Sequence, residues 1–353
     1  MIKQIRVENF RCFDTFEVDK FKQVNLLIGG NGSGKTSLLE ALFIASNPAD
    51  MGSFLFLNGA RGVTAELPLF LDTFMYKRDI SKQIKVACQT EDERYITTYR
   101  LDDVAPTIDS KNFLPIKGVN TVLQTCETTR LTSGETTYFE NQAMTLSPSN
   151  GGFTTLWSKE LTNPYPKSCR GHVGFRAVTA PNRLESGLLE FIKSLATNQE
   201  DGILTEILKK FDHTILKVSL IGNDIFYATS DTGALYPIAI AGDGFLKVLY
   251  LLLGILNSKN GAVFIDEVDN GIHISNQKKF WKLMLDFAKK FNVQVFATTH
   301  SIDCLDAVAS VYQENTSEED SLAIFRMKQH TSTPISISLA GLAGALAEGY
   351  EVR

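Results

Sequence analysis

The first part of the chain alternates apolar and polar residues with the two-residue period of β-strands. This pattern covers residues 2–7 and 13–18, and residues 24–28 form a short, continuous apolar run. Residues 35–46 then carry apolar side chains at helical spacing, and Pro48 follows them. We therefore expect a strand-rich start and a helix that begins near Lys35.

The next segments predict a hairpin and then a change of character. Residues 84–88 and 95–99 indicate two strands that are joined across polar residues 91–93. Residues 102–170 are rich in Thr, Ser, Asn and Pro and show weak periodicity, so we expect an irregular insertion or lid there. The insertion has no sustained heptads, which excludes a long coiled-coil arm.

Regular patterning returns after Pro181. We expect helices at residues 186–197, 203–211, 243–257 and 275–290, strands at 214–221, 224–229, 262–265 and 293–297, and a tail with strands near 322–327 and 335–338 and a helix from Leu339. Apolar strands that alternate with helices indicate an α/β fold, with a parallel or mixed sheet covered by helices on both faces.

Composition and charge narrow the function classes. The 353 residues are 44% hydrophobic, which is enough for a large core. The net charge of −5 argues against a broad basic surface for nucleic acid, although a local patch stays open. The N-terminus lacks a signal-peptide pattern, and the apolar run at 245–256 is too short to span a bilayer. The five cysteines of the chain are scattered and form no CxxC pair. We expect a soluble, cytoplasmic protein with reduced thiols and no membrane partner.

The sequence Gly-Gly-Asn-Gly-Ser-Gly-Lys-Thr at residues 29–36 fits the GxxxxGK[ST] pattern between an apolar strand and a helix. Glycine lets successive backbone N–H groups wrap around phosphate oxygens, and the helix N-terminus adds partial positive charge. Lys35 is expected to contact the β- and γ-phosphates, and the Thr36 hydroxyl to ligate Mg²⁺. The motif therefore predicts ATP and Mg²⁺ as cofactors.

A second motif is the apolar strand at 262–265, which ends in two carboxylates. Asp266 is suited to holding Mg²⁺, and Glu267 to polarising the attacking water. His300 follows the strand at 293–297 and is placed to contact the γ-phosphate. A surface turn would explain an isolated Asp-Glu pair, and a lone histidine is more often structural. The GxxxxGK[ST] motif at residues 29–36, a P-loop, favours the catalytic interpretation for both the Asp-Glu pair and His300.

A third motif is the turn Ile240-Ala241-Gly242-Asp243-Gly244, which precedes a helix. It resembles the glycine-rich signature of ABC ATPases, whose helix N-terminus binds the γ-phosphate on the opposite subunit. Ala241 stands where a serine is usual, and Asp243 adds a negative charge. The alternative is a plain loop in which Asp243 caps the helix.

The expected nucleotide-binding residues are Gly29, Gly30, Asn31, Gly32, Ser33, Gly34, Lys35, Thr36, Ser37, Ala241, Gly242, Asp243 and Gly244. The expected catalytic residues are Glu267, His300 and Lys35, and the expected metal ligands are Thr36 and Asp266.

Residues 7–13, the turn at 242–244, residues 266–273 and residues 298–301 together resemble the RecF/SMC-like branch of ABC ATPases. The likeness is to the ATPase part of OLD-family (overcoming lysogenization defect) proteins and their stand-alone relatives, and it covers residues 1–47 and 172–353. It implies that residues 269–273 cross a dimer interface. OLD nucleases carry a C-terminal TOPRIM domain, but only 53 residues follow His300, so we expect none here.

The resemblance implies a slow ATPase that forms a nucleotide-dependent homodimer, or a higher even oligomer. Such a protein would act as a sensor or scaffold for a separately encoded effector, a nuclease or toxin, in antiphage defence. The alternative is a RecF-like DNA-repair ATPase that binds DNA directly. A transporter subunit is disfavoured, because 206 residues separate Lys35 from Ala241.

We expect three parts in the chain. Residues 1–101 form the N-terminal half of the ATPase core with the P-loop, residues 102–170 form an insertion that faces a partner, and residues 171–353 form the C-terminal half. This last part carries the signature-like turn, the Asp-Glu pair and His300.

Overall fold

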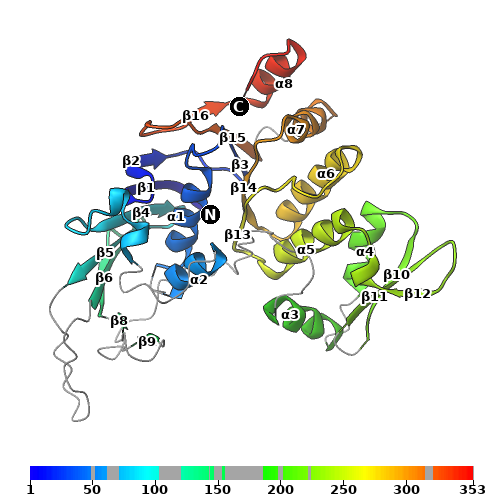
Figure 1. Ribbon diagram of the computed structural model, residues 1–353, viewed down its shortest axis with the longest axis horizontal. Helices are drawn as coiled ribbons and strands as arrows, with labels where there is room; N and C mark the ends of the chain where they lie inside the picture. Colours follow the sequence, from blue (N-terminus) through cyan, green and yellow to red (C-terminus); the bar gives the residue numbers. More distant parts are fainter. Residues whose placement is uncertain are drawn as a thin grey trace. The chain divides into compact units, whose positions relative to one another are not determined.

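The computed structural model describes residues 1–48, 52–61, 71–102, 121–142, 144–146, 153–155, 186–197, 202–221, 224–314 and 321–352 (Figure 1). The chain falls into two compact units. The first contains residues 1–21, 29–170 and 325–336, and the second contains residues 22–28, 171–324 and 337–353.

The first unit is built on a six-stranded antiparallel sheet with the order β2-β1-β4-β5-β6-β7. Its strands are β1 (Ile2–Phe10), β2 (Phe13–Val18), β4 (Ile84–Thr90), β5 (Glu93–Asp102), β6 (Thr121–Arg130) and β7 (Thr136–Gln142). Two short strands, β8 (Met144–Leu146) and β9 (Phe153–Thr155), pair with each other. Helix α1 (Lys35–Ser46) packs on β1 and β4, and helix α2 (Gly52–Ala60) packs on α1.

The expectation of an irregular segment at residues 102–170 is wrong where the structure describes it. Strand β6 pairs with β5 over its whole length, and β7 pairs with β6. β6 contains four threonines, and β-branched threonine suits a pleated strand as well as a polar loop. The rest of that segment, apart from β8 and β9, lies outside the described residues.

The second sheet has the order β13-β14-β3-β15-β16, in which β13, β14 and β3 run parallel. Its strands are β3 (Val24–Ile28), β13 (Ala262–Ile265), β14 (Gln294–Thr298), β15 (Leu322–Arg326) and β16 (Ile335–Ile337). The helices of the second unit are α3 (Ser186–Thr197), α4 (Gly202–Phe211), α5 (Asp243–Asn257), α6 (Ile274–Lys290), α7 (Ile302–Glu314) and α8 (Leu339–Ala347). A small antiparallel sheet holds β10 (Ile215–Ile221), β11 (Asp224–Thr229) and β12 (Leu235–Pro237).

The parallel strands are buried on both faces, as their continuous apolar sequence predicts. Val263 and Ile265 of β13 join the core that α5 and α6 cover. Phe264 points to the other face and stacks on Phe296 of β14, with ring centroids 5.4 Å apart. The strand ends are thus held rigidly by packing on both sides, which fixes the residues that follow them.

The α/β fold expected from the sequence is confirmed, and most expected elements lie within two residues of the observed ones. Outside residues 102–170, the sequence analysis missed the helices α2 and α7 and the strand β12. Each helix in the described part of the chain is too short or too polar to span a bilayer. The cysteines within the described ranges are unbonded, and Cys169 lies outside them.

Candidate functional site

The glycine-rich turn that connects β3 to α1 requires its glycines. Gly29, Gly32 and Gly34 have φ angles of 143°, 71° and 97°, which other residues rarely adopt. A β-carbon on Gly29 would lie 2.5 Å from the carbonyl oxygen of Met327, and one on Gly34 would lie 2.8 Å from the Phe13 ring. Both the backbone angles and the close packing therefore exclude larger residues.

This turn holds two buried polar groups. Lys35 begins α1, and its Nζ donates to the carbonyl oxygens of Gly29 and Gly30 at 2.7 and 3.0 Å. The buried Ser33 hydroxyl has no hydrogen-bond partner among the described residues. A buried hydroxyl without a hydrogen-bond partner costs free energy of folding. A bound ligand could supply that partner, because the Ser33 hydroxyl can donate to a ligand oxygen.

The other predicted residues of the turn are accessible to different extents. Gly30, Asn31 and Gly32 are exposed at the tip of the turn. Thr36 and Ser37 are half-buried in the first turn of α1. The structure therefore brings all nine P-loop residues expected from the sequence into one strand–turn–helix.

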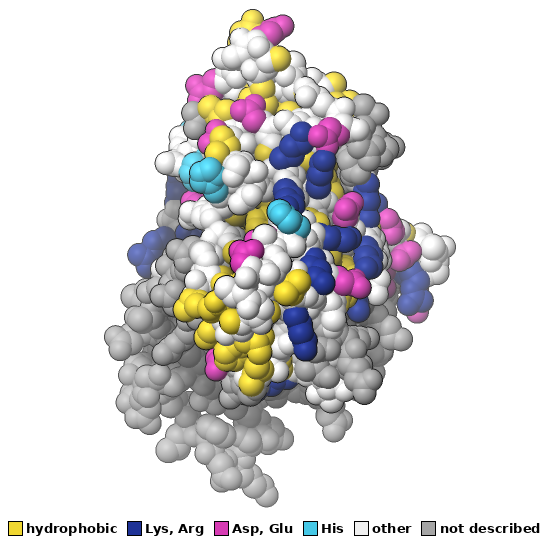
Figure 2. All heavy atoms as spheres, turned by 90° about the vertical axis from the view of Figure 1, so that its right-hand side faces the viewer, with side chains coloured by type: hydrophobic (Ala, Val, Ile, Leu, Met, Phe, Trp, Pro, Cys, Tyr) yellow, Lys and Arg dark blue, Asp and Glu magenta, His cyan; other side chains and the backbone are white. Residues whose placement is uncertain are grey.

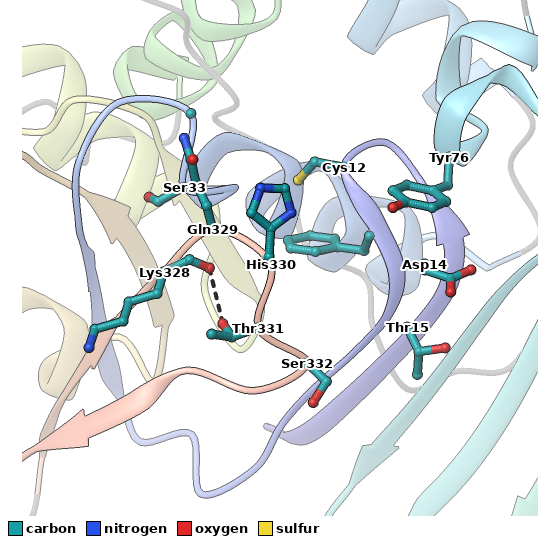
Figure 3. Close-up of a pocket in the computed structure, with 12 residues that line it drawn as sticks. Cys12, Asp14, Thr15, Ser33, Tyr76, Lys328, Gln329, His330, Thr331 and Ser332 are labelled. Carbon is teal, nitrogen blue, oxygen red and sulfur yellow. Dashed lines mark hydrogen bonds between the residues drawn. The ribbon is translucent and has the colours of Figure 1, made fainter.

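A pocket of about 540 Å³ lies beside this turn within the first unit (Figure 3). The pocket is lined by Cys12 of the β1–β2 turn and the start of β2 (Phe13, Asp14 and Thr15), by Gly32 and Ser33 of the P-loop, by Tyr76, and by residues 328–332 of the β15–β16 connection. The Gln329 amide donates to the carbonyl oxygen of Asn31 at 3.3 Å, and the Thr331 hydroxyl donates to that of Lys328 at 3.0 Å. The pocket thus combines aromatic walls with polar groups next to the P-loop.

An ion-pair cluster anchors α1 to the end of β1. Glu40 of α1 is fully buried and accepts from Arg11 at 2.9 Å and from Arg61 at 2.6 Å. Arg11 also lies over the Phe74 ring, 3.8 Å from its centroid. Burial lowers the pKa of Arg11, and the Glu40 carboxylate opposes that shift. The cluster fixes the helix whose first residue is Lys35.

The two carboxylates predicted after the apolar strand at 262–265, Asp266 and Glu267, have the arrangement of a Walker B motif and follow β13 in the second unit. Asp266 is half-buried and Glu267 is exposed. The buried Thr298 hydroxyl, at the end of the neighbouring strand β14, donates to Asp266 Oδ1 at 2.5 Å. The Thr298 hydroxyl oxygen in turn accepts from the backbone N–H of Glu267 at 2.8 Å. One threonine therefore orients both predicted residues.

Glu267 has an unusual backbone that a buried lysine contacts. Its φ is 50°, in the left-handed region. Its carbonyl oxygen accepts from Lys247 Nζ of α5 at 2.9 Å, and its carboxylate accepts a long bond from Asn270 at 3.4 Å. Burial lowers the pKa of Lys247 to about 8, opposed by the charges of Asp269 and Glu267.

The signature-like turn packs against the loop that follows Walker B. Helix α5 begins at Asp243, and Gly242 is its N-cap residue. The side chain of Asp243 lies outside the described residues, so the alternative of a cap by Asp243 stays untested. Ala241 is half-buried and Gly242 is exposed. A β-carbon on Gly244 would lie 2.8 Å from the carbonyl oxygen of Gly271, so only glycine allows this approach.

His300 is exposed and lies two residues after the end of β14. The preceding Thr299 is buried and donates to Asp269 Oδ1 at 2.5 Å, and the Ser301 N–H donates to the Thr299 hydroxyl at 3.0 Å. Neighbouring strand ends thus place Asp266, Glu267 and His300 at one edge of the parallel sheet.

The sequence analysis missed Lys247, Thr298 and the pocket lining. Lys247 carried a signal, because it is the one charged residue in the apolar run at 245–256. The acidic residue Glu314 ends α7 and pairs with Lys278 and Lys282 of α6. The acidic residues after it lie outside the described residues.

Known proteins resemble this chain to different extents. An "ATP/GTP phosphatase" of Helicobacter pylori is 24% identical over 344 residues, which is 89% of each chain. A "DNA replication and repair protein RecF" of Exiguobacterium is 46% identical over 43 residues, which is 12% of each. Among solved structures, the SMC head domain of Thermotoga maritima is 14% identical with a TM-score of 0.44, over 96% of this chain and 99% of that one.

The model of one family, described as the AAA ATPase domain, matches residues 1–161 and 175–305. This match includes the P-loop, the signature-like turn, the Walker B carboxylates and His300. The chain belongs to the AAA ATPase domain family, and it is an enzyme that hydrolyses ATP.

Proposed function

We propose that the chain is a nucleotide-switched ATPase whose P-loop binds the triphosphate of ATP. The observation that carries this proposal is the buried pair of Lys35 and Ser33 inside the glycine-rich turn. An ammonium and an unpaired hydroxyl, surrounded by backbone N–H groups at a helix N-terminus, match the charge and the oxygen atoms of a phosphate.

The metal and water roles follow from the donor chemistry. A threonine hydroxyl and one carboxylate suit Mg²⁺, which keeps water and phosphate oxygens as its other ligands. Thr36 and Asp266 would hold the ion, which when bound would neutralise phosphate charge. Glu267 would take the proton from the attacking water, and His300 would contact the γ-phosphate. The Thr298 hydroxyl holds both residues in place, because it donates to the Asp266 carboxylate and accepts from the Glu267 backbone N–H.

The pocket beside the P-loop is the proposed site of the nucleotide base. Tyr76, Phe13 and His330 offer ring surfaces for stacking, and Gln329 and Thr331 offer polar groups. The pocket shares Gly32 and Ser33 with the P-loop, so one ligand can reach both places.

The proposed biological role comes from the resemblance to stand-alone OLD-like ATPases. Closure of an ATP-bound homodimer, or a higher even oligomer, would control a separately encoded effector in antiphage defence. The signature-like turn supports this, because Gly242 is exposed at the N-terminus of the 15-residue helix α5 and can meet a phosphate from another subunit.

The test is the Glu267→Gln variant. The amide keeps the shape but not the base, so ATP binding should persist while turnover falls by roughly 10²–10⁴-fold. Native mass measurement with ATP and Mg²⁺, alone and with the product of a neighbouring gene, should show a stable dimer or a multiple of it. The matched control is Glu206→Gln, an exposed glutamate on α4. A monomer under saturating ATP would contradict the switch.

The RecF-like alternative, direct DNA binding, rests on the short RecF matches. The helix after Walker B gives it little support, because Lys278 and Lys282 are paired with Glu314. Figure 2, which shows the side of the molecule that lies on the right in Figure 1, has acidic side chains interleaved with the basic ones. DNA binding by the isolated protein that weakens steeply with salt would favour this alternative.

A further inference from the structure

Helix α5 contains a lysine where an apolar residue would pack without cost. Lys247 is 4% exposed, and its neighbours Leu246 and Val248 are 3% and 0% exposed. Taking an ammonium out of water is costly unless partners replace the lost hydration. The atoms that Lys247 contacts should therefore explain why this buried position carries a charged residue.

The Lys247 ammonium contacts the backbone of Glu267 rather than a distant part of the core. Its Nζ donates to the Glu267 carbonyl oxygen at 2.9 Å. The N–H of the same residue donates to the Thr298 hydroxyl at 2.8 Å. Side chains from α5 and β14 thus hold both backbone polar groups of one residue.

Glu267 is also the residue whose backbone needs such support. A non-glycine residue at a φ of 50° is strained, and it keeps that conformation only where its surroundings over-determine it. The left-handed backbone also sets the direction of the Glu267 side chain. A contact that fixes φ and ψ therefore fixes where the carboxylate points.

We propose that Lys247 is a positioning residue for ATP hydrolysis, holding Glu267 in the left-handed conformation that presents its carboxylate to the attacking water. The inference rests on the proposed role of Glu267 as the base. Lys247 itself stays remote from the nucleotide in this role and acts through the Glu267 backbone.

The nearby Asp269 offers a different role for the same lysine. Asp269 and Glu267 both act on Lys247 electrostatically, and Asp269 also accepts from Thr299. If Lys247 served only as a counter-charge for Asp269, Asp269→Asn would lower turnover as much as Lys247→Met. Positioning of Glu267 predicts instead that Asp269→Asn has the smaller effect.

The central experiment compares single-turnover hydrolysis and ATP affinity in three variants of the full chain. Lys247→Met keeps the length and removes the donor, and a misplaced catalytic group can lower the rate on the order of 10²-fold. Lys247→Arg keeps a donor and should restore most of that loss. The matched control is Gln277→Met, which removes a buried donor to the carbonyl oxygen of Ile272 in the same loop and should leave the rate unchanged.

A double variant separates positioning from general destabilisation. Adding Lys247→Met to Glu267→Gln should lower the rate no further, because the carboxylate that Lys247 orients is already absent. A further loss in the double variant, or an equal loss in Gln277→Met, would overturn the proposal. So would full activity in Lys247→Met. If Glu267→Gln alone were fully active, the proposed function of Glu267 would fail instead.

Discussion

Two turns of this protein solve the same backbone problem in opposite ways. The P-loop after β3 reaches positive φ with Gly29, Gly32 and Gly34, which have no side chain. The turn after β13 reaches it with Glu267, which carries a side chain on a strained backbone. In the first turn the backbone N–H groups are proposed to bind phosphate, whereas in the second turn the Glu267 side chain is the proposed catalytic base.

The difference shows where each turn obtains its rigidity. The glycine turn is packed tightly against Met327 and Phe13, so steric contact keeps it in place. The Glu267 turn relies on hydrogen bonds from Thr298 and Lys247. Side-chain substitutions should therefore harm the first turn through added volume, and the second through lost donors and acceptors.

The largest effect is expected from Lys35→Ala, which removes the charged group of the P-loop. ATP binding should become unmeasurable by calorimetry. The free energy of unfolding without nucleotide should fall by only about 1 kcal/mol, for the lost bonds to Gly29 and Gly30. ATP hydrolysis at the parental rate would show that the turn is not the nucleotide site.

A methyl group distinguishes two adjacent glycines of the P-loop. Gly29→Ala would place its β-carbon 2.5 Å from the Met327 carbonyl oxygen at a φ of 143°, so stability should fall by more than about 2 kcal/mol and ATP affinity with it. At Gly30 nothing lies within 4 Å of an added β-carbon, so Gly30→Ala should change the free energy of unfolding by less than about 1 kcal/mol. Equal denaturant midpoints would contradict the packing argument.

Replacing Glu267 by glycine and by alanine tests the strain directly. Both variants should lose turnover, but Glu267→Gly should be more stable than Glu267→Ala by about 1 kcal/mol, because glycine adopts a φ of 50° freely. At Glu206, within helix α4, the order should reverse by about 1 kcal/mol. Urea unfolding of the four variants gives both differences, and the same sign at both positions would exclude strain at Glu267.

The smallest effect is expected from Ala241→Ser in the signature-like turn, and Gly242→Arg in the same turn is its contrast. Ala241→Ser restores the usual hydroxyl, but the exposed backbone before α5 already offers its N–H groups, so turnover should change by no more than about threefold, within roughly 0.7 kcal/mol. Gly242→Arg should block turnover by filling the phosphate space. Rapid steady-state hydrolysis in Gly242→Arg would place this turn away from the chemistry.

The sequence predicted those parts of the site that depend on short, contiguous motifs. The P-loop, the carboxylates after β13 and the exposed His300 each combine a local pattern with a strand end, and the structure has these elements where the periodicity placed them. Threonine-rich β6 was mistaken for a loop because its composition suits both states.

The remaining parts depend on contacts between distant residues. The pocket is completed by residues 328–332, which lie about three hundred positions from the P-loop, and no local pattern marks them. The hydrogen bonds that hold the Glu267 backbone come from Lys247 of α5 and Thr298 of β14. They can be recognised only once the strands are paired. Lys247 was conspicuous in the sequence, but the residue that it contacts was not.

The position of β3 in its sheet has a consequence for how the protein is made. β3 leaves the ribosome early, but its sheet neighbours are β14 and β15, which are encoded about 270 and 300 residues later. At typical rates of synthesis this apolar strand waits on the order of tens of seconds for its neighbours. Nascent chains stalled before residue 294 should therefore expose β3 to chaperones, and the P-loop that follows it should bind ATP only after β14 and β15 have been synthesised.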